Sequence, residues 1–194
     1  MPVPHELLTF EPRRGALSQP RPTAWVKSRD SRRQALKGRD RCIGMPQSLS
    51  QLYVHLAFST QHRESSLLAP LRAQMHAYLA TVLTNSDSPA ILVGGTSDHV
   101  HALFRLSKNS SLAEIVEEIK TSSSKWVKTQ GRALASFHWQ SGYGGFSVSP
   151  ADTEKVAEYI AQQETHHRAV SFQEEYRKLL KSQGIEFDER YVWD

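Results

Sequence analysis

An α+β fold is predicted for this chain: a ferredoxin-like antiparallel sheet with helices on one face, followed by C-terminal helices. The prediction rests first on the order of the elements, which is β-α-β-β-α-β and then two helices. Such an order suits an antiparallel sheet whose connecting helices lie on a single face. It rests also on strand-like alternation in the first element and on capping signals at several helices.

Extended segments account for the predicted sheet. Residues 52–58 alternate between apolar and other side chains, which is the period of a half-buried strand. A second strand at 90–93 ends at Gly94 and Gly95, and a third strand covers 99–106. A further extended stretch at 137–139 leads through glycine-rich sequence to 146–148.

Two helices are predicted between the strands. Pro70 opens the first, because proline is favoured at the start of a helix, and apolar residues recur on one stripe from Leu71 to Val82. Ser111 and Glu114 form a capping box for the second.

Two further helices are predicted near the C-terminus. Ser149 caps the first of them and Pro150 occupies its first position. Ser171 and Glu174 form a capping box for the last helix, which Gly184 ends.

The positive charge of the chain is concentrated in residues 1–44. This segment carries ten Lys/Arg and four Asp/Glu, a balance of +6, whereas residues 45–194 carry fourteen and sixteen, a balance of −2. Five of the nine prolines also lie there, so we expect a disordered basic leader before a folded domain at 45–194. Two alternatives stay open: a basic arm that holds DNA, or a segment that is not translated because translation begins at Met45.

Composition excludes several classes of protein. No apolar stretch approaches the ~18 residues of a membrane-spanning helix, and the N-terminus lacks the apolar block of a secretory signal. The single cysteine, Cys42, excludes an internal disulfide framework and a zinc site of several thiolates. We expect a cytoplasmic protein without a membrane partner. Because the domain is not basic overall, any nucleic-acid binding must come from a local patch.

Two histidines on the third predicted strand are candidate metal ligands. His99 and His101 are two residues apart, so they share a face with Leu103 and Arg105, while the alternate residues form an apolar face. We expect helices to cover the apolar face and the histidines, together with His55, to lie on the opposite, more open face. Two imidazoles hold a divalent ion weakly, so a third donor is required; without it they would be solvated polar residues.

Tyr159 and Gln163 supply the remaining chemistry. They are four residues apart on a predicted helix and therefore neighbours, and Gln163 lies close to the apolar stripe at 156–160. An inward amide needs a partner, which a metal ion would provide. A phenol is scarcely ionised at neutral pH, so attack on a phosphodiester requires a polarising cation. The plainer alternatives are a backbone hydrogen bond for Gln163 and a core aromatic role for Tyr159.

Several ordered motifs match one family. They are 98–101, 139–149, 159–163, 166–168, 172–176 and 189–193. With these motifs the chain resembles the single-tyrosine HUH transposases of small bacterial insertion sequences and their REP-associated relatives. The resemblance covers residues 45–194 and leaves the leader unmatched.

The resemblance implies a nucleoid-associated homodimer that cuts and rejoins single-stranded DNA through a 5′-phosphotyrosine intermediate, with Mg²⁺ or Mn²⁺ as cofactor. It makes Tyr159 the nucleophile and His99, His101 and Gln163 the metal ligands. The glycine-rich segment would be a hinge for the tyrosine helix, with Gly142, Gly144 and Gly145 as its hinge residues. The roles of His55, His166 and His167 stay open.

Family members bind DNA hairpins, and the second predicted helix offers a candidate surface for this. Its basic and aromatic cluster consists of Lys120, Lys125, Trp126 and Lys128. Such side chains could contact phosphates or stack on bases, and they equally suit a solvated helix face with a core tryptophan.

Other functions weighed against a transposase are a nickase of the replication-initiator or relaxase type and a catalytically silent nucleic-acid-binding module. The metal site of such a nickase usually includes a third histidine. The silent module would display stacking aromatics on its open sheet face, where this chain has His99, His101 and Arg105. A two-motif histidine phosphoesterase is excluded because its second histidine motif is missing.

Overall fold

The structure is a computed structural model that describes residues 48–167 and 170–193. The predictions for the leader at 1–44 lie outside the described residues. The chain divides into two units, Met1–Met45 and Pro46–Asp194, and every described element belongs to the second. Across the described residues, none of the helices is both long and apolar enough to span a bilayer.

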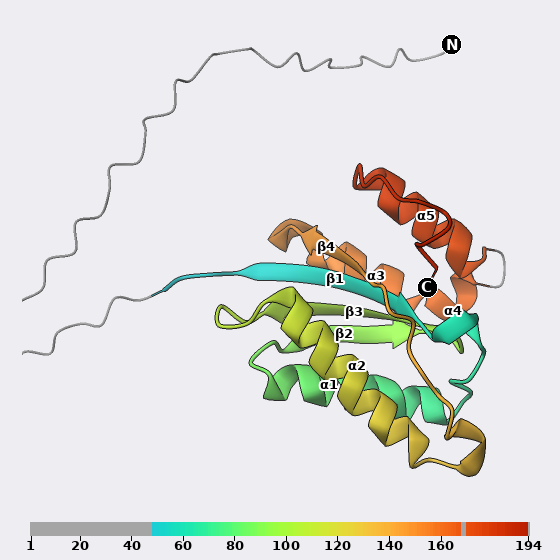
Figure 1. Cartoon of the computed structure of the whole chain (residues 1–194). Helices are drawn as coiled ribbons and strands as arrows, with labels where there is room; N and C mark the ends of the chain where they lie inside the picture. Colours follow the sequence, from blue (N-terminus) through green and yellow to red (C-terminus); the bar gives the residue numbers. More distant parts are fainter. Residues whose placement is uncertain (1–47, 168–169, 194) are drawn as a thin grey trace, which may run out of the picture. The chain divides into compact units, whose positions relative to one another are not determined.

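Four antiparallel strands form one sheet, in the spatial order β2-β3-β1-β4 (Figure 1). They are β1 (Leu52–Ser59), β2 (Ala90–Gly95), β3 (His99–Leu106) and β4 (Gly144–Val148). The predicted α+β class is confirmed. The stretch at 137–139 contributes only an isolated bridge, between Trp139 and Thr60, so the fourth strand begins later, at the glycine-rich segment.

Helices α1 (Leu71–Asn85) and α2 (Leu112–Lys128) cover one face of the sheet (Figure 1). Their apolar stripes pack on the alternate residues of β1 and β3, as the sequence predicts. The buried residues of this core include Leu56, Phe58, Val100, Phe104, Met75, Leu79, Ile115 and Ile119. The predicted capping box of α2 is present, since the Ser111 side chain accepts from the Glu114 backbone and Glu114 reciprocates.

The opposite face is covered by α3 (Thr153–Ala161), α4 (Gln163–His166) and α5 (Phe172–Ser182), with a 3₁₀ turn η3 (Pro150–Asp152) before them. Two further 3₁₀ turns are η1 (Gln61–Arg63) and η2 (Arg132–Leu134). Ser149 caps η3 and the predicted capping box of α5 is present. A second apolar cluster forms under α5 from Ala57, Phe146, Phe172, Tyr176 and Leu180.

The expectation that the histidine face of the sheet is open is wrong. His99 and His101 are 0% exposed and His55 is 3% exposed, because the C-terminal helices close over them. In the sequence only the connecting helices were assigned to a face of the sheet. The strongly amphipathic α5 also has an apolar stripe, and this stripe packs on the histidine face.

The predicted helix that carries Tyr159 and Gln163 is interrupted. α3 ends at Ala161 and α4 begins at Gln163, because Gln162 leaves helical geometry with φ −91° and ψ 6°. Helix α3 lies close to β2 at Gly94, where an added Cβ would come within 2.7 Å of the Ile160 side chain. Glycine at this position therefore lets α3 approach the sheet closely enough for Gln163 to reach β3.

Candidate functional site

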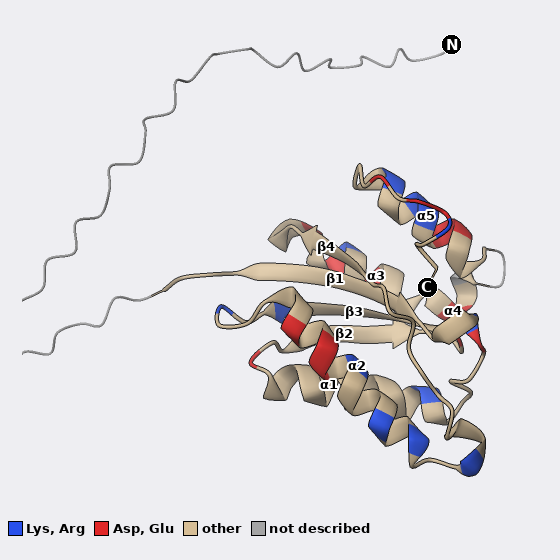
Figure 2. Ribbon diagram, in the orientation of Figure 1, with Lys and Arg blue, Asp and Glu red and all other residues tan. Residues whose placement is uncertain are grey.

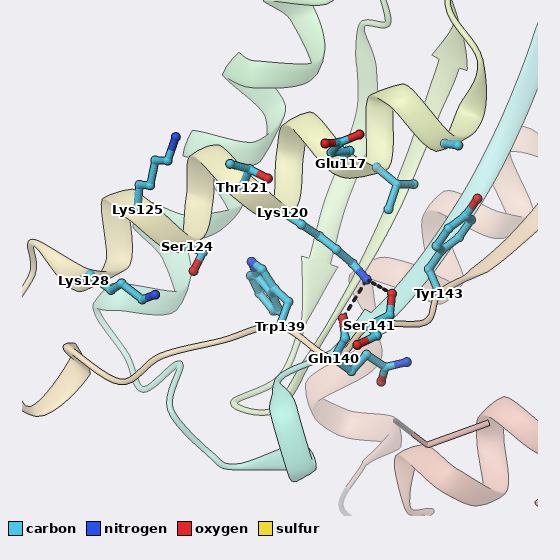
Figure 3. Close-up of a pocket in the computed structure, with 12 residues that line it drawn as sticks. Glu117, Lys120, Thr121, Ser124, Lys125, Lys128, Trp139, Gln140, Ser141 and Tyr143 are labelled. Carbon is cyan, nitrogen blue, oxygen red and sulfur yellow. Dashed lines mark hydrogen bonds between the residues drawn. The ribbon is translucent and has the colours of Figure 1, made fainter. Parts of the chain in front are cut away.

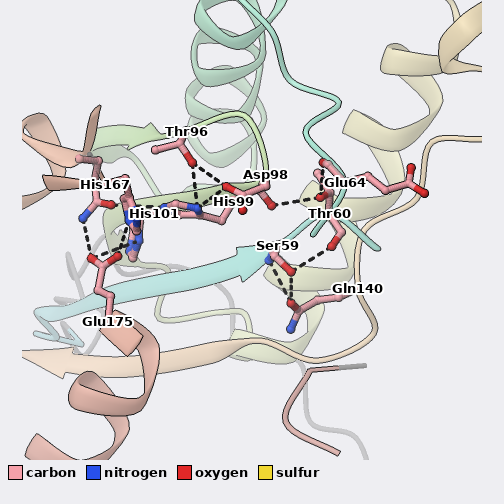
Figure 4. A network of polar contacts seen from close by, with 11 residues as sticks. Ser59, Thr60, Glu64, Thr96, Asp98, His99, His101, Gln140, His167 and Glu175 are labelled. Carbon is pink, nitrogen blue, oxygen red and sulfur yellow. Dashed lines mark hydrogen bonds and ion pairs between the residues drawn. The ribbon is translucent and has the colours of Figure 1, made fainter. Parts of the chain in front are cut away.

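His99 is oriented by two neighbours in the turn before β3 (Figure 4). Its Nδ1 atom lies 2.8 Å from Oδ1 of Asp98 and 2.9 Å from Oγ1 of Thr96. Burial alone would raise the pKa of Asp98, but hydrogen bonds from His99 and Thr96 outweigh it and hold that pKa below its usual value. An ionised Asp98 accepts the Nδ1 proton, which leaves the Nε2 lone pair of His99 facing the site.

Gln163 faces Nε2 of His99 with its side-chain amide. Its Nε2 atom donates to Oε1 of Glu175 at 2.8 Å, which fixes the orientation of the amide. Its Oε1 atom therefore points to Nε2 of His99, at 3.3 Å. With the His99 proton on Nδ1, Nε2 of His99 and Oε1 of Gln163 are both acceptors, which is the arrangement that two ligands of a shared cation would have.

His101 presents the second imidazole. Its Nδ1 atom lies 2.9 Å from Nε2 of His55, and its Nε2 atom is directed to Oε1 of Glu175, 3.9 Å away. Burial lowers the pKa of His55 to about 4, so this partner is a neutral imidazole. The Nε2 atoms of both predicted histidine ligands thus converge on one region.

Glu175 is a site residue that the sequence analysis did not assign. One donor atom each from His99, His101 and Glu175 lie within 4.8 Å of one another, and all three residues are buried. The Oε2 atom of Glu175 also lies 2.5 Å from Nε2 of His167 (Figure 4). Burial raises the pKa of Glu175 to about 7, and the negative charge of Asp98 adds to the shift. The available signal was a carboxylate on the apolar side of α5, three residues after Phe172.

The donor set fits a divalent cation. Two imidazole nitrogens, one amide oxygen and one carboxylate oxygen form the mixed nitrogen and oxygen environment that Mn²⁺ accepts, and the oxygen donors also suit Mg²⁺. His99, His101, Gln163 and Glu175 are therefore the residues that could hold the ion. The arrangement includes all three metal ligands predicted from the sequence.

Tyr159 lies beside this group on α3 of the same chain. Its ring centroid is 5.8 Å from that of His101 and 6.0 Å from that of His55, edge-on in both contacts. The tyrosine lines a cavity of about 420 Å³ between α3 and α5. The other residues that line this cavity are His55, Lys155, Val156, Glu175, Lys178, Leu179 and Ser182. The predicted nucleophile and the candidate metal site thus adjoin one cavity with lysines in its lining.

The predicted DNA-binding cluster lies on the other face of the sheet, on α2. Figure 2 shows acidic residues in the first half of this helix and basic residues in the second. Lys125 and Lys128 line a groove of about 550 Å³ between α2 and residues 139–143 (Figure 3). Trp126 instead stacks on Tyr78 of α1, with ring centroids 5.0 Å apart, and packs against the core.

Lys120 is engaged within the protein. Its ammonium donates to the backbone oxygens of Gln140 and Ser141 at 2.9 and 3.2 Å (Figure 3). It also donates to the backbone oxygen of Gly142 at 2.7 Å. Burial lowers its pKa to about 8. Because an ammonium has three donors, these bonds use its full capacity. Lys125 and Lys128 therefore remain as the candidates for phosphate contacts, while Lys120 stabilises the loop before β4.

The glycine-rich segment has close packing at two of its three glycines. Gly144 and Gly145 pair with β1, and an added Cβ would lie 2.7 Å from Oη of Tyr176 or 2.7 Å from Cδ2 of Leu112, respectively. Packing accounts for glycine at these two positions, and the hinge role of all three, including Gly142, stays a prediction. The side chain of His166 lies outside the described residues.

Comparison with known proteins gives a family match. Residues 48–163, more than half of the chain, match the family described as "Transposase IS200 like". No curated protein matches the sequence. A candidate transposase from Deinococcus radiodurans R1 is similar in structure, with 19% identity over 66% of this chain and 98% of that one and a TM-score of 0.48.

A second similar structure is a REP-associated tyrosine transposase bound to a REP hairpin. It has 15% identity over 64% of this chain and 74% of that one, with a TM-score of 0.49. The family match confirms the resemblance inferred from the motifs. This chain belongs to the IS200-like transposase family.

Proposed function

We propose that this transposase cleaves and rejoins single-stranded DNA through a 5′-phosphotyrosine intermediate on Tyr159, in a reaction that depends on a divalent metal. The observation that carries the proposal is the convergence of His99 Nε2 and Gln163 Oε1, 3.3 Å apart, with the Tyr159 ring beside the neighbouring His101. Both lone pairs are fixed by hydrogen bonds on the far side of each group.

The protein residues have separate tasks in this mechanism. His99, His101, Gln163 and Glu175 would hold Mg²⁺ or Mn²⁺, and the bound ion would supply Lewis-acid polarisation of the scissile phosphodiester. Asp98 accepts a hydrogen bond from the Nδ1 proton of His99, and this leaves the Nε2 atom of His99 available for the ion. The phosphotyrosine ester stores the energy of the broken bond for rejoining, whereas attack by water would discard it.

The covalent step balances within the substrate and Tyr159. The phenolic oxygen forms a bond to phosphorus, and the bond from phosphorus to the 3′ oxygen breaks. One proton leaves the phenol and one is taken up by the departing 3′ oxygen, so no net proton is consumed. The reverse reaction, with a new 3′-hydroxyl as nucleophile, rejoins the strand and releases Tyr159.

The partners of this activity are single-stranded DNA, DNA hairpins and a second copy of the chain. Lys125 and Lys128, at the groove on α2, are the proposed phosphate contacts outside the active site. We propose a homodimer that acts on DNA in the bacterial cytoplasm, at the nucleoid.

The proposal is tested with a labelled oligonucleotide that carries a hairpin and a single-stranded flank. Incubation with Mn²⁺ should give a protein–DNA adduct that survives denaturation and is not formed in excess EDTA. Tyr159→Phe should abolish the adduct while hairpin binding persists, and Tyr191→Phe, at a tyrosine that is 69% exposed, should leave both unchanged. An undiminished adduct in Tyr159→Phe would show that another residue is the nucleophile.

A further inference from the structure

His55 on β1 meets His101 on β3 across the centre of the sheet. The Nε2 atom of His55 lies 2.9 Å from Nδ1 of His101, the ring centroids are 5.1 Å apart, and the ring planes differ by 29°. The strand register pairs His101 with Ala57, which makes the contact a diagonal one between adjacent strands. Both histidines are buried.

The tautomer of His101 decides whether it can bind a metal through Nε2. A neutral imidazole carries one proton and offers one lone pair, on opposite nitrogens. Binding through Nε2 therefore requires the proton on Nδ1, and the group that accepts from Nδ1 selects this tautomer. For His99 that acceptor is the carboxylate of Asp98.

We propose that His55 is the corresponding positioning residue for His101: its Nε2 atom accepts the Nδ1 proton of His101 and so keeps the Nε2 lone pair directed to the metal position. The inference rests on the proposed metal-dependent function and deepens it. It adds a residue that binds no metal itself but determines whether a ligand can.

A neutral acceptor suits this position better than a carboxylate would. Asp98 and Glu175 already bring two acidic groups to the buried site. A third carboxylate beside His101 would add buried charge at a high desolvation cost. His55, neutral because it is buried, orients the ligand without that cost.

Packing holds the His55 ring in place for this task. Tyr159 contacts it edge-on with centroids 6.0 Å apart, and Phe146 lies at the same centroid distance on β4. The ring therefore has a fixed edge toward His101. Its neighbour Tyr159 is also the proposed nucleophile, so the ligand and the nucleophile share one supporting residue.

The first test uses the metal-free protein and no catalysis. Nitrogen-15 chemical shifts of the His101 ring in wild type should show the proton on Nδ1 and a lone pair on Nε2. In His55→Phe, which keeps an aromatic ring but removes the acceptor, this preference should be lost. A wild-type His101 that carries its proton on Nε2 overturns the proposal without any variant.

The second test measures Mn²⁺ affinity by calorimetric titration. His55→Phe should bind Mn²⁺ roughly tenfold or more weakly, the usual effect of losing a hydrogen-bond partner of a ligand. His55→Gln, whose amide oxygen can accept the same proton, should recover most of that loss, and His138→Phe, at an exposed histidine, should bind as wild type does. Equal affinity of His55→Phe and wild type contradicts the inference, whereas a wild type that binds no Mn²⁺ contradicts the metal site itself.

Discussion

The amide nitrogen of Gln163 donates a 2.8 Å hydrogen bond to the carboxylate of Glu175, and this contact turns the amide oxygen toward His99. Two helices that follow each other late in the chain, α4 and α5, are thereby joined over β3. Glu175 thus orients one proposed ligand and is placed to be another.

Glu175→Gln should weaken Mn²⁺ binding by about 10–100-fold, because it removes a charged oxygen from the site and its bond to His167. The substitution keeps the size of the side chain, so the fold should persist. Calorimetric titration against wild type measures the effect. Glu186→Gln, at an exposed position after α5, is the matched control. Unchanged affinity in Glu175→Gln would exclude the carboxylate from the site.

Metal binding should weaken as the pH falls through 7. In the metal-free protein the pKa of Glu175 is raised to about 7, so below this pH the carboxyl is protonated and the ion must displace the proton. Well below that pKa the apparent affinity should fall by roughly tenfold per pH unit for this one group. Titrations between pH 5.5 and 8 measure the slope. A flatter slope in Glu175→Gln than in wild type assigns the proton, and parallel slopes would contradict the assignment.

Glu175 should also make the stability of the metal-free protein depend on pH. Its folded-state pKa of about 7 lies above the ordinary value of 4.5, so its stabilising contribution is complete below pH 4.5. That contribution is lost as the pH rises through 7 in the metal-free protein. Urea unfolding at pH 5 and pH 8 should show this loss in wild type and a smaller one in Glu175→Gln. An equal pH dependence in the two proteins would contradict it.

Substitutions of the α2 lysines should have two different effects, one on DNA binding and one on stability. Lys125→Ala and Lys128→Ala should weaken DNA binding and reduce its salt dependence by about 0.7 to 0.9 for each phosphate that is no longer neutralised. Lys120→Met should leave the salt dependence unchanged and lower the free energy of unfolding by about 1–3 kcal/mol, because three backbone oxygens lose their donor. Binding measured against salt, with urea unfolding of each variant, distinguishes them. A reduced salt slope for Lys120→Met would refute its internal role.

Gly144→Ala should destabilise the protein by about 1–3 kcal/mol, as overpacking does in a well-packed interior. The added methyl group would lie 2.7 Å from Oη of Tyr176 and 2.8 Å from Cζ of Phe146. Ser147→Ala, at an exposed position of the same strand, should be close to neutral. A fully stable Gly144→Ala that has lost cleavage would instead favour the hinge role.

Local signals predicted the elements well because their causes lie within a few residues. The capping box of Ser111 and Glu114 and that of Ser171 and Glu174 both form as predicted, since each needs only one helical turn. The pairing of His99 with His101 likewise follows from the two-residue period of a strand. Such features were available without any knowledge of tertiary contacts.

The remaining features depend on segments far apart in the sequence. Glu175 became a site residue only when α5 docked on the histidine face, and the same docking buried His55. Lys120 is engaged by a loop some twenty residues away, at 140–142. The period of a strand or helix predicts the face of the element on which a side chain lies, but it does not predict which segment covers that face.

The central claim, a phosphotyrosine ester at Tyr159, is tested most directly by peptide mapping of the covalent adduct. After nuclease trimming and proteolysis, mass spectrometry should locate one nucleotide remnant, attached through its 5′ phosphate, on the peptide that contains Tyr159. A remnant on any other residue, or one attached through a 3′ phosphate, would contradict the account.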